Sequence, residues 1–77
     1  MKVELRSTEK VVQLVVEGRA VPARIWEGRT ESGIPCHAYV TRIAVDRADD
    51  VSEFERDLKE HAPPSPAIAE IPLRLIL

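Results

Sequence analysis

The sequence predicts an α+β domain: a mainly antiparallel sheet of four or five strands, in the order β-β-β-β-α-β, with one helix packed on a face of the sheet. Three observations lead to this prediction. Apolar and polar residues alternate through much of the first 45 residues, the apolar spacing becomes helical after residue 50, and the last seven residues alternate again. A length of 77 residues leaves room for a single domain, residues 1–77.

Two strands are predicted before the first glycine. Val3 and Leu5 alternate with charged residues, and the polar residues 7–10 indicate a turn. Residues 11–17, VVQLVVE, are rich in β-branched side chains and predict the second strand. Residues 18–19, which include a glycine, then indicate another turn.

A third and a fourth strand are predicted on either side of a bend. Residues 21–27 alternate, but Pro22 has no N–H to donate, so this strand starts late, lies at a sheet edge there, or contains a bulge. Residues 36–45 are apolar on both faces, which predicts a central strand or one covered by a partner subunit. Between the two strands, Gly28 and Gly33 are expected to take positive φ in a hairpin bend.

The apolar spacing over residues 51–61 predicts one amphipathic helix. Phe54 and Leu58 lead its apolar stripe, which we expect to pack on the sheet. A capping box is expected at its start, with Asp50 or Ser52 as the N-cap residue.

The remaining residues are predicted to carry the chain back along the sheet. Residues 63–69, PPSPAIA, indicate a stiff extended connector because proline restricts φ. Residues 71–77, IPLRLIL, alternate and predict a last strand. We expect so apolar a segment to be buried.

Composition favours a homodimer. A chain of this length buries only about 60% of the surface that its unfolded state exposes, so its core is thin. The single cysteine, Cys36, excludes an internal disulfide and leaves too few soft ligands for a structural zinc site, and oligomerisation is then the remaining means of stabilisation. No apolar run approaches the ~20 residues of a membrane span, which together with a free thiol favours a cytoplasmic protein without a membrane partner.

Residue types used in catalysis are not grouped as an active site requires. Cys36 and His37 are adjacent on a predicted strand, so their side chains point to opposite faces and cannot readily hold one metal or act as nucleophile and base. The serines fall in predicted turns, a helix cap or the connector, and no glycine motif for nucleotide binding is present. We therefore expect no catalytic residue, metal or cofactor, and favour a protein that is not an enzyme.

The candidate binding surface surrounds the single tryptophan. Arg24 and Trp26 share one face of a predicted strand, and the fourth predicted strand and the bend bring further cations near. An indole ring among guanidinium groups can stack on a nucleic-acid base or bind an acidic partner. Alternatively, it packs in a core or dimer interface beside solvated arginines. The complete candidate set is Arg24, Trp26, Arg29, His37 and Arg42.

The block VPARIWEGRTESGIPCHAYVTRIAV, about a third of the chain, resembles the core of small uncharacterised bacterial and prophage-associated proteins that share a WEGxTESGIPxHxxxTRI-like pattern. The matching positions are Trp26, Glu27, Gly28, Thr30, Glu31, Ser32, Gly33, Ile34, Pro35, His37, Thr41, Arg42 and Ile43. The resemblance implies no reaction or cofactor. It implies only that the hairpin forms a unit.

These observations favour a small non-enzymatic protein-interaction or regulatory module that acts as a homodimer and binds an unidentified protein partner. One alternative is a nucleic-acid-binding module that uses the arginines around Trp26. The net charge is −2, and residues 1–47 hold only eight Lys or Arg against six acids, well short of a dense basic surface. A second alternative is a small enzyme with a site between subunits, which depends on His37 and the acidic residues of the bend.

Overall fold

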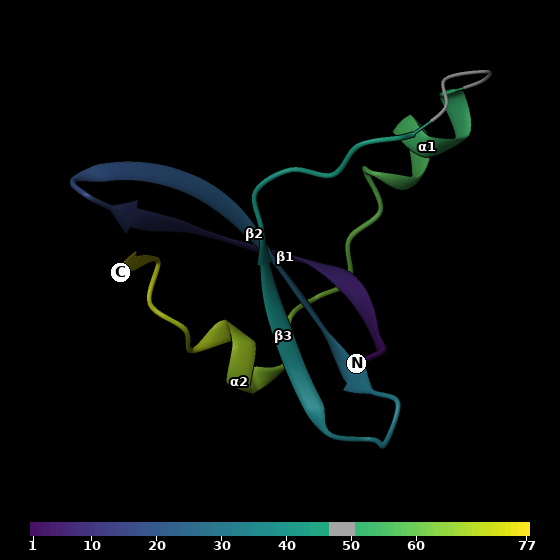
Figure 1. Cartoon of the computed structure of the whole chain (residues 1–77), viewed down its shortest axis with the longest axis horizontal. Helices are drawn as coiled ribbons and strands as arrows, with labels where there is room; N and C mark the ends of the chain where they lie inside the picture. Colours follow the sequence, from purple (N-terminus) through teal and green to yellow (C-terminus); the bar gives the residue numbers. More distant parts are fainter. Residues whose placement is uncertain (47–50) are drawn as a thin grey trace.

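A long hairpin of β1 and β2 organises the chain (Figure 1). The computed structural model describes residues 1–46 and 51–77. β1 runs over Val3–Val16 and β2 over Arg19–Thr30, joined by a turn in which Glu17 and Gly18 have φ of 52° and 79°. Two successive positive φ values are typical of tight hairpins, because this turn matches the twist of the strands. The turn predicted at residues 18–19 thus lies one residue earlier.

The first two predicted strands are one strand, because β1 continues through the residues predicted to turn. Its register with β2 shifts between Ser7 and Val11, which marks a bulge. Thr8 lies in this bulge and is fully buried; its hydroxyl donates to the Ile25 carbonyl over 2.7 Å and accepts from the N–H of Lys10. A buried threonine that satisfies these backbone groups thus replaces the predicted polar turn.

β3 (Pro35–Val40) pairs antiparallel with β2, as predicted for a hairpin, but it forms an edge of the sheet rather than its centre. Its pairing with β2 starts at Arg24, so Pro22 lies where β2 is open on that side, one of the placements predicted for it. Residues 41–45, predicted to continue the strand, lie outside it.

The bend between β2 and β3 is held by Thr30. Its N–H donates to the Ile34 carbonyl over 2.9 Å, and its hydroxyl accepts from the Ile34 N–H. Gly33 takes the predicted positive φ, at 89°. Gly28 does not: it lies within β2, where a Cβ would overlap the carbonyl of Glu4 in β1. Gly28 is therefore required for close strand approach and not for a turn.

β4 (Arg74–Ile76) pairs parallel with β1, which makes the four-stranded sheet mixed, in the order β3-β2-β1-β4. The α+β class and a sheet of four strands are confirmed, but the sheet is not mainly antiparallel. The long connection over residues 41–73, which holds both helices, brings the chain back in the direction of β1. The element order is therefore β-β-β-α-α-β.

Both helices are short. α1 (Ser52–Asp57) is shorter than predicted and has no fully buried residue; Val51 occupies its N-cap position without a side-chain bond, while Asp50 lies outside the described residues. α2 (Pro66–Ala69) lies in the segment predicted to be extended. In the described part of the chain, no helix has the length and apolarity needed to cross a membrane.

The sequence around α2 explains why a helix forms there. Ser65 is the N-cap residue, its hydroxyl accepts from the Ile68 N–H, and Pro66 occupies the first turn. Serine at the N-cap and proline just inside are favourable helix-start residues. The Lys10 ammonium donates to the Ala69 carbonyl over 3.0 Å and ties the end of this helix to β1.

Most of the buried core lies on one face of the sheet, which we call the packed face; Val15, 6% exposed, is buried on the other side. The centre of the core consists of Val12, Ala23 and Ile25 from the hairpin and Ile68 from α2. Leu14, Ile71 and Leu75 pack around it. The prediction that the last segment is buried is wrong for much of it, since Leu73, Ile76 and Leu77 stay exposed.

Candidate functional site

Trp26 lies on the opposite side of the sheet, which we call the groove face. The register pairs Trp26 with Ser7 of β1 and with Ala38 of β3, and direct cross-strand partners point to the same side. Arg24, two positions before Trp26, shares that side. Both side chains are half-buried.

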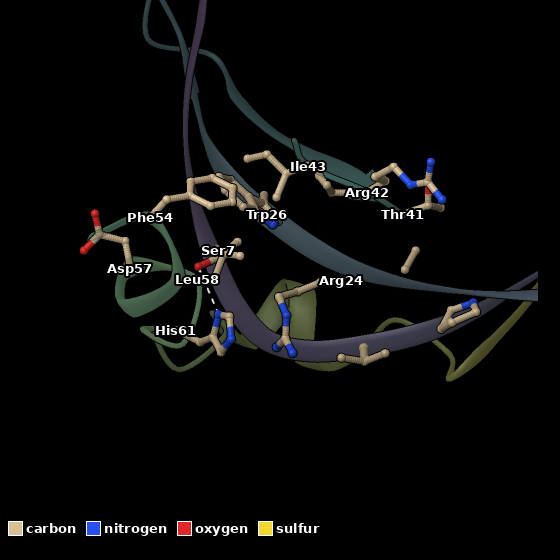
Figure 2. Close-up of a pocket in the computed structure, with 14 residues that line it drawn as sticks. Ser7, Arg24, Trp26, Thr41, Arg42, Ile43, Phe54, Asp57, Leu58 and His61 are labelled. Carbon is tan, nitrogen blue, oxygen red and sulfur yellow. Dashed lines mark hydrogen bonds between the residues drawn. The ribbon is translucent and has the colours of Figure 1, made fainter. Parts of the chain in front are cut away.

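A groove of about 350 Å³ opens on this face, between the hairpin and α1 (Figure 2). This volume is near the lower end of the ~300–1,000 Å³ typical of ligand sites. The apolar residues that line it are Val11, Pro22, Ala23, Trp26, Val40, Ile43, Phe54 and Leu58. The groove can therefore accept apolar side chains of a short segment.

Positive charge borders the apolar wall. Arg24 Nη1 donates to the Thr8 carbonyl over 2.9 Å, which fixes the guanidinium at the groove. Arg42, just beyond β3, lines the groove and is exposed. Asp57 is the acidic residue of the lining, and Figure 2 shows its carboxylate directed away from the other labelled side chains. The polar edge of the groove thus favours an acidic group on a ligand.

Ser7 and His61 meet in the groove lining, with 3.1 Å between Oγ and Nδ1 (Figure 2). The Ser7 hydroxyl also donates to the Glu60 carbonyl over 3.0 Å. A hydroxyl has one hydrogen, so with this bond made, His61 donates through Nδ1–H. In that arrangement His61 does not accept the serine proton, as a general base must.

The Ser7 and His61 contact has a structural role. The N–H of Ala62 donates to the Ser7 carbonyl over 3.0 Å, and the N–H of Glu9 donates to the Ala62 carbonyl over 2.9 Å. These bonds anchor the segment after α1 to the bulge of β1. They therefore hold α1 beside the groove face without closing it.

The structure brings together three of the five predicted site residues: Arg24, Trp26 and Arg42 line the groove. Arg29 instead donates to the Gly33 carbonyl over 3.1 Å in the bend. His37 pairs opposite Glu27, and its Nε2 lies 3.2 Å from the Tyr39 hydroxyl.

Cys36 and His37 point to opposite sides of β3, as predicted. Cys36 pairs with Gly28 and His37 pairs with Glu27, and adjacent residues of a strand face opposite ways. Among residues 1–46 and 51–77, no group of three or more His, Cys, Asp and Glu side chains is placed to hold a metal ion.

Glu27, an acid on which the enzyme alternative depends, holds the start of α2. Its Oε2 accepts from the Ser65 N–H over 2.8 Å. Hydrogen bonds from the Ser65 backbone and then from its hydroxyl lower the pKa of Glu27 below its ordinary value of 4.5; burial opposes this and the charge of His37 adds to it. This carboxylate thus stabilises the packed face.

The predicted site did not include Ser7, Phe54, Leu58 and His61, which also line the groove. The helical spacing predicts that Phe54 and Leu58 share a stripe, and that signal is correct. It predicts packing on the sheet, however, and does not indicate that a gap remains beside Trp26. Ser7 carries no such signal because it lies in the unrecognised bulge.

Comparison of the chain with protein-family models, with curated proteins and with solved structures finds no match. The resemblance of residues 21–45 to a bacterial and prophage-associated family stays a prediction. The functional argument therefore depends on the chemistry of the groove and of the exposed surface.

Proposed function

We propose that this protein is a non-enzymatic interaction module that acts as a homodimer and binds a partner protein in the groove. The observation that carries the proposal is the large solvent-exposed surface of the chain. The 8.6 kDa chain exposes 6246 Å², whereas a compact monomer of this mass exposes about 4,700 Å². Its radius of gyration is 13.9 Å, against about 11.5 Å for a compact domain of this length.

Association of two copies would remove this excess of exposed surface from water. Exposed apolar side chains in the described residues include Leu73, Ile76 and Leu77, at 67%, 78% and 76% of their full exposure. Burial of apolar surface is the main favourable term in most protein association. A specific interface buries about 800 Å² on each partner, which the excess accommodates.

For the groove we infer a segment of a partner protein that carries apolar side chains next to an acidic residue. Trp26 and Phe54 supply aromatic surface, and Arg24 and Arg42 supply charge of the matching sign. Aromatic and arginine residues are the types that contribute most to protein interfaces. Arg42 has no bonding partner within residues 1–46 and 51–77, so its guanidinium is available to a carboxylate.

The single tryptophan provides the test of the groove. An acetylated Leu-Leu-Glu-Glu amide peptide should change Trp26 fluorescence in a saturable way, and the matched Leu-Leu-Lys-Lys peptide should bind about tenfold more weakly or less. Sedimentation of the unliganded chain should show a dimer. Equal responses to both peptides would remove the charge argument, and no response to either would overturn the proposed groove function.

A second candidate function, binding of single-stranded nucleic acid, is favoured by the presence of Arg24, Trp26 and Arg42 in the lining of one groove. Stacking of bases on an aromatic ring beside cations is the usual basis of such binding. The net charge of −2 disfavours it, because attraction to phosphates supplies most of the affinity. Saturable quenching of Trp26 by oligothymidine at low salt, without a response to either peptide, would establish this alternative in place of the first.

A further inference from the structure

β4 leaves one edge of the sheet open in a defined register. Gln13 donates to the Leu73 carbonyl over 2.7 Å, and Leu77 donates to the Val15 carbonyl over 2.9 Å. Backbone groups of successive residues in a strand point to alternate sides. Arg74 and Ile76 therefore direct their N–H and C=O groups away from β1, where they form a template for another strand.

The side chains along this edge are apolar and exposed. Leu73 retains 67%, Ile76 78% and Leu77 76% of their full exposure, although Leu75 packs against the core. Natural edge strands are usually protected by charge, proline or a covering element. On this edge Arg74 is the single charged residue between Leu73 and Leu77.

The opposite edge, formed by β3, is built differently. The Thr30 N–H bonds to the Ile34 carbonyl, so the alternation turns the backbone groups of Pro35, His37 and Tyr39 outward. Pro35 has no N–H to offer, and the side chains of His37 and Tyr39 bond to each other. β4 is therefore the edge suited to pairing.

We propose that β4 pairs antiparallel with β4 of a second copy, about a two-fold axis through Leu75; this inference rests on the proposed homodimer. In that register Arg74 faces Ile76 of the second copy, and the two exchange N–H···O=C bonds in both directions. Leu75 faces Leu75, and Leu73 faces Leu77. The strand is thus self-complementary, with leucine opposite leucine and the two Arg74 side chains offset from each other.

The paired sheet runs without interruption through both copies and leaves the groove accessible. β4 lies at the end of the long hairpin away from α1 (Figure 1), and no residue of 71–77 lines the groove. A two-fold interface of this kind uses the same surface on both subunits and closes on itself.

Disulfide cross-linking tests the register. In a Cys36→Ser background, chains carrying Arg74→Cys and chains carrying Ile76→Cys are each oxidised alone and as an equal mixture. Directly opposed residues have Cα atoms about 5.5 Å apart, within disulfide range, whereas like positions are offset by two residues. We expect cross-linked dimer in the mixture and little in either chain alone. Cross-linking that is no greater in the mixture than in the separate chains would overturn the register.

Sedimentation of full-length variants tests the surface. Leu77→Lys should raise the dimer dissociation constant by about tenfold or more, because it places a charge in the leucine pairs of both copies. Ile34→Lys, at an aliphatic position in the bend at the other edge that is also exposed, at 60%, should leave the constant unchanged. A Leu77→Lys variant that dimerises like the unmodified chain would overturn the β4 interface and leave the homodimer proposal standing, whereas a monomeric unmodified chain would overturn both.

Discussion

The two faces of the sheet use their apolar residues in different ways. On the packed face, Val12, Ala23 and Ile25 are exposed by 1% or less, because α2 inserts Ile68 over them. On the groove face, Trp26 is half-buried and Leu58 is 38% exposed, because α1 stands beside the sheet without sealing it. The difference indicates that the packed face supplies stability and that the groove face is available for recognition.

The largest effect on stability is expected at the centre of the packed face. Ile25→Ala should lower the free energy of unfolding by about 2–5 kcal/mol, since it removes a fully buried side chain and leaves a cavity. Val21→Ala, on the same side of β2 but 38% exposed, is the matched control and should cost much less. Urea denaturation at one fixed protein concentration measures both, and equal losses would contradict the proposed division between core and periphery.

Thr8 tests whether the bulge of β1 is held by its hydroxyl. Thr8→Val should lower the free energy of unfolding by about 1–3 kcal/mol, because the Ile25 carbonyl and the Lys10 N–H lose a buried partner. Thr8→Ser keeps the hydroxyl and should cost less. If thermal denaturation shows the serine variant to be the weaker of the two, the methyl group and not the hydrogen bonds stabilises the bulge.

Glu27 makes the stability of the packed face depend on pH. Glu27→Gln should lower stability at neutral pH by about 1 kcal/mol, because the charged acceptor of the Ser65 N–H becomes neutral. The folded pKa of Glu27 lies below 4.5, so its contribution is present above that value and is lost as the pH falls through the folded pKa. Denaturation curves of the variant and the unmodified chain should therefore converge in acid. Glu31→Gln, an exposed acid in the bend, serves as the control and should change little at either pH.

The smallest effect on stability is expected in the groove. Leu58→Ala should change the free energy of unfolding by less than about 1 kcal/mol, since the side chain is already 38% exposed. It should nevertheless weaken binding of the Leu-Leu-Glu-Glu peptide by about fivefold or more, measured by Trp26 fluorescence. Val16→Ala, at an exposed position away from the groove, should leave binding unchanged. A large stability loss with normal peptide binding would reverse the roles assigned to the two faces.

Local pattern was a good guide to the fold where alternation and turn chemistry decide the structure. Strands lie in every segment that alternates, and Gly33 turns the chain at the predicted bend. The pattern failed at residues 7–10, where the polar residues indicate a turn although Thr8 is buried within a strand. It also failed at residues 66–69, where the prolines predict an extended connector although Ser65 and Pro66 begin a helix.

The candidate site, like the fold, was predicted correctly where local pattern decides the structure and incorrectly elsewhere. Arg24 and Trp26 share a side because they are two positions apart on one strand, which the sequence shows directly. Arg29 and His37 differ from that prediction because the bend and the register of β3 give them local partners in Gly33 and Tyr39. Such pairings depend on where a strand ends, which is the least predictable feature of a local pattern.

By itself the sequence determined the α+β class, the hairpin between β2 and β3 and the opposite orientations of Cys36 and His37, because each follows from the period of a strand or from a turn residue. Only the tertiary structure decided that β4 runs parallel to β1, that α2 covers one face, and that α1 leaves a groove beside Trp26. These features depend on contacts between residues far apart in the chain, such as Glu27 with Ser65 and Ser7 with His61. The spacing of apolar and polar residues along the chain does not indicate which distant residue a side chain contacts.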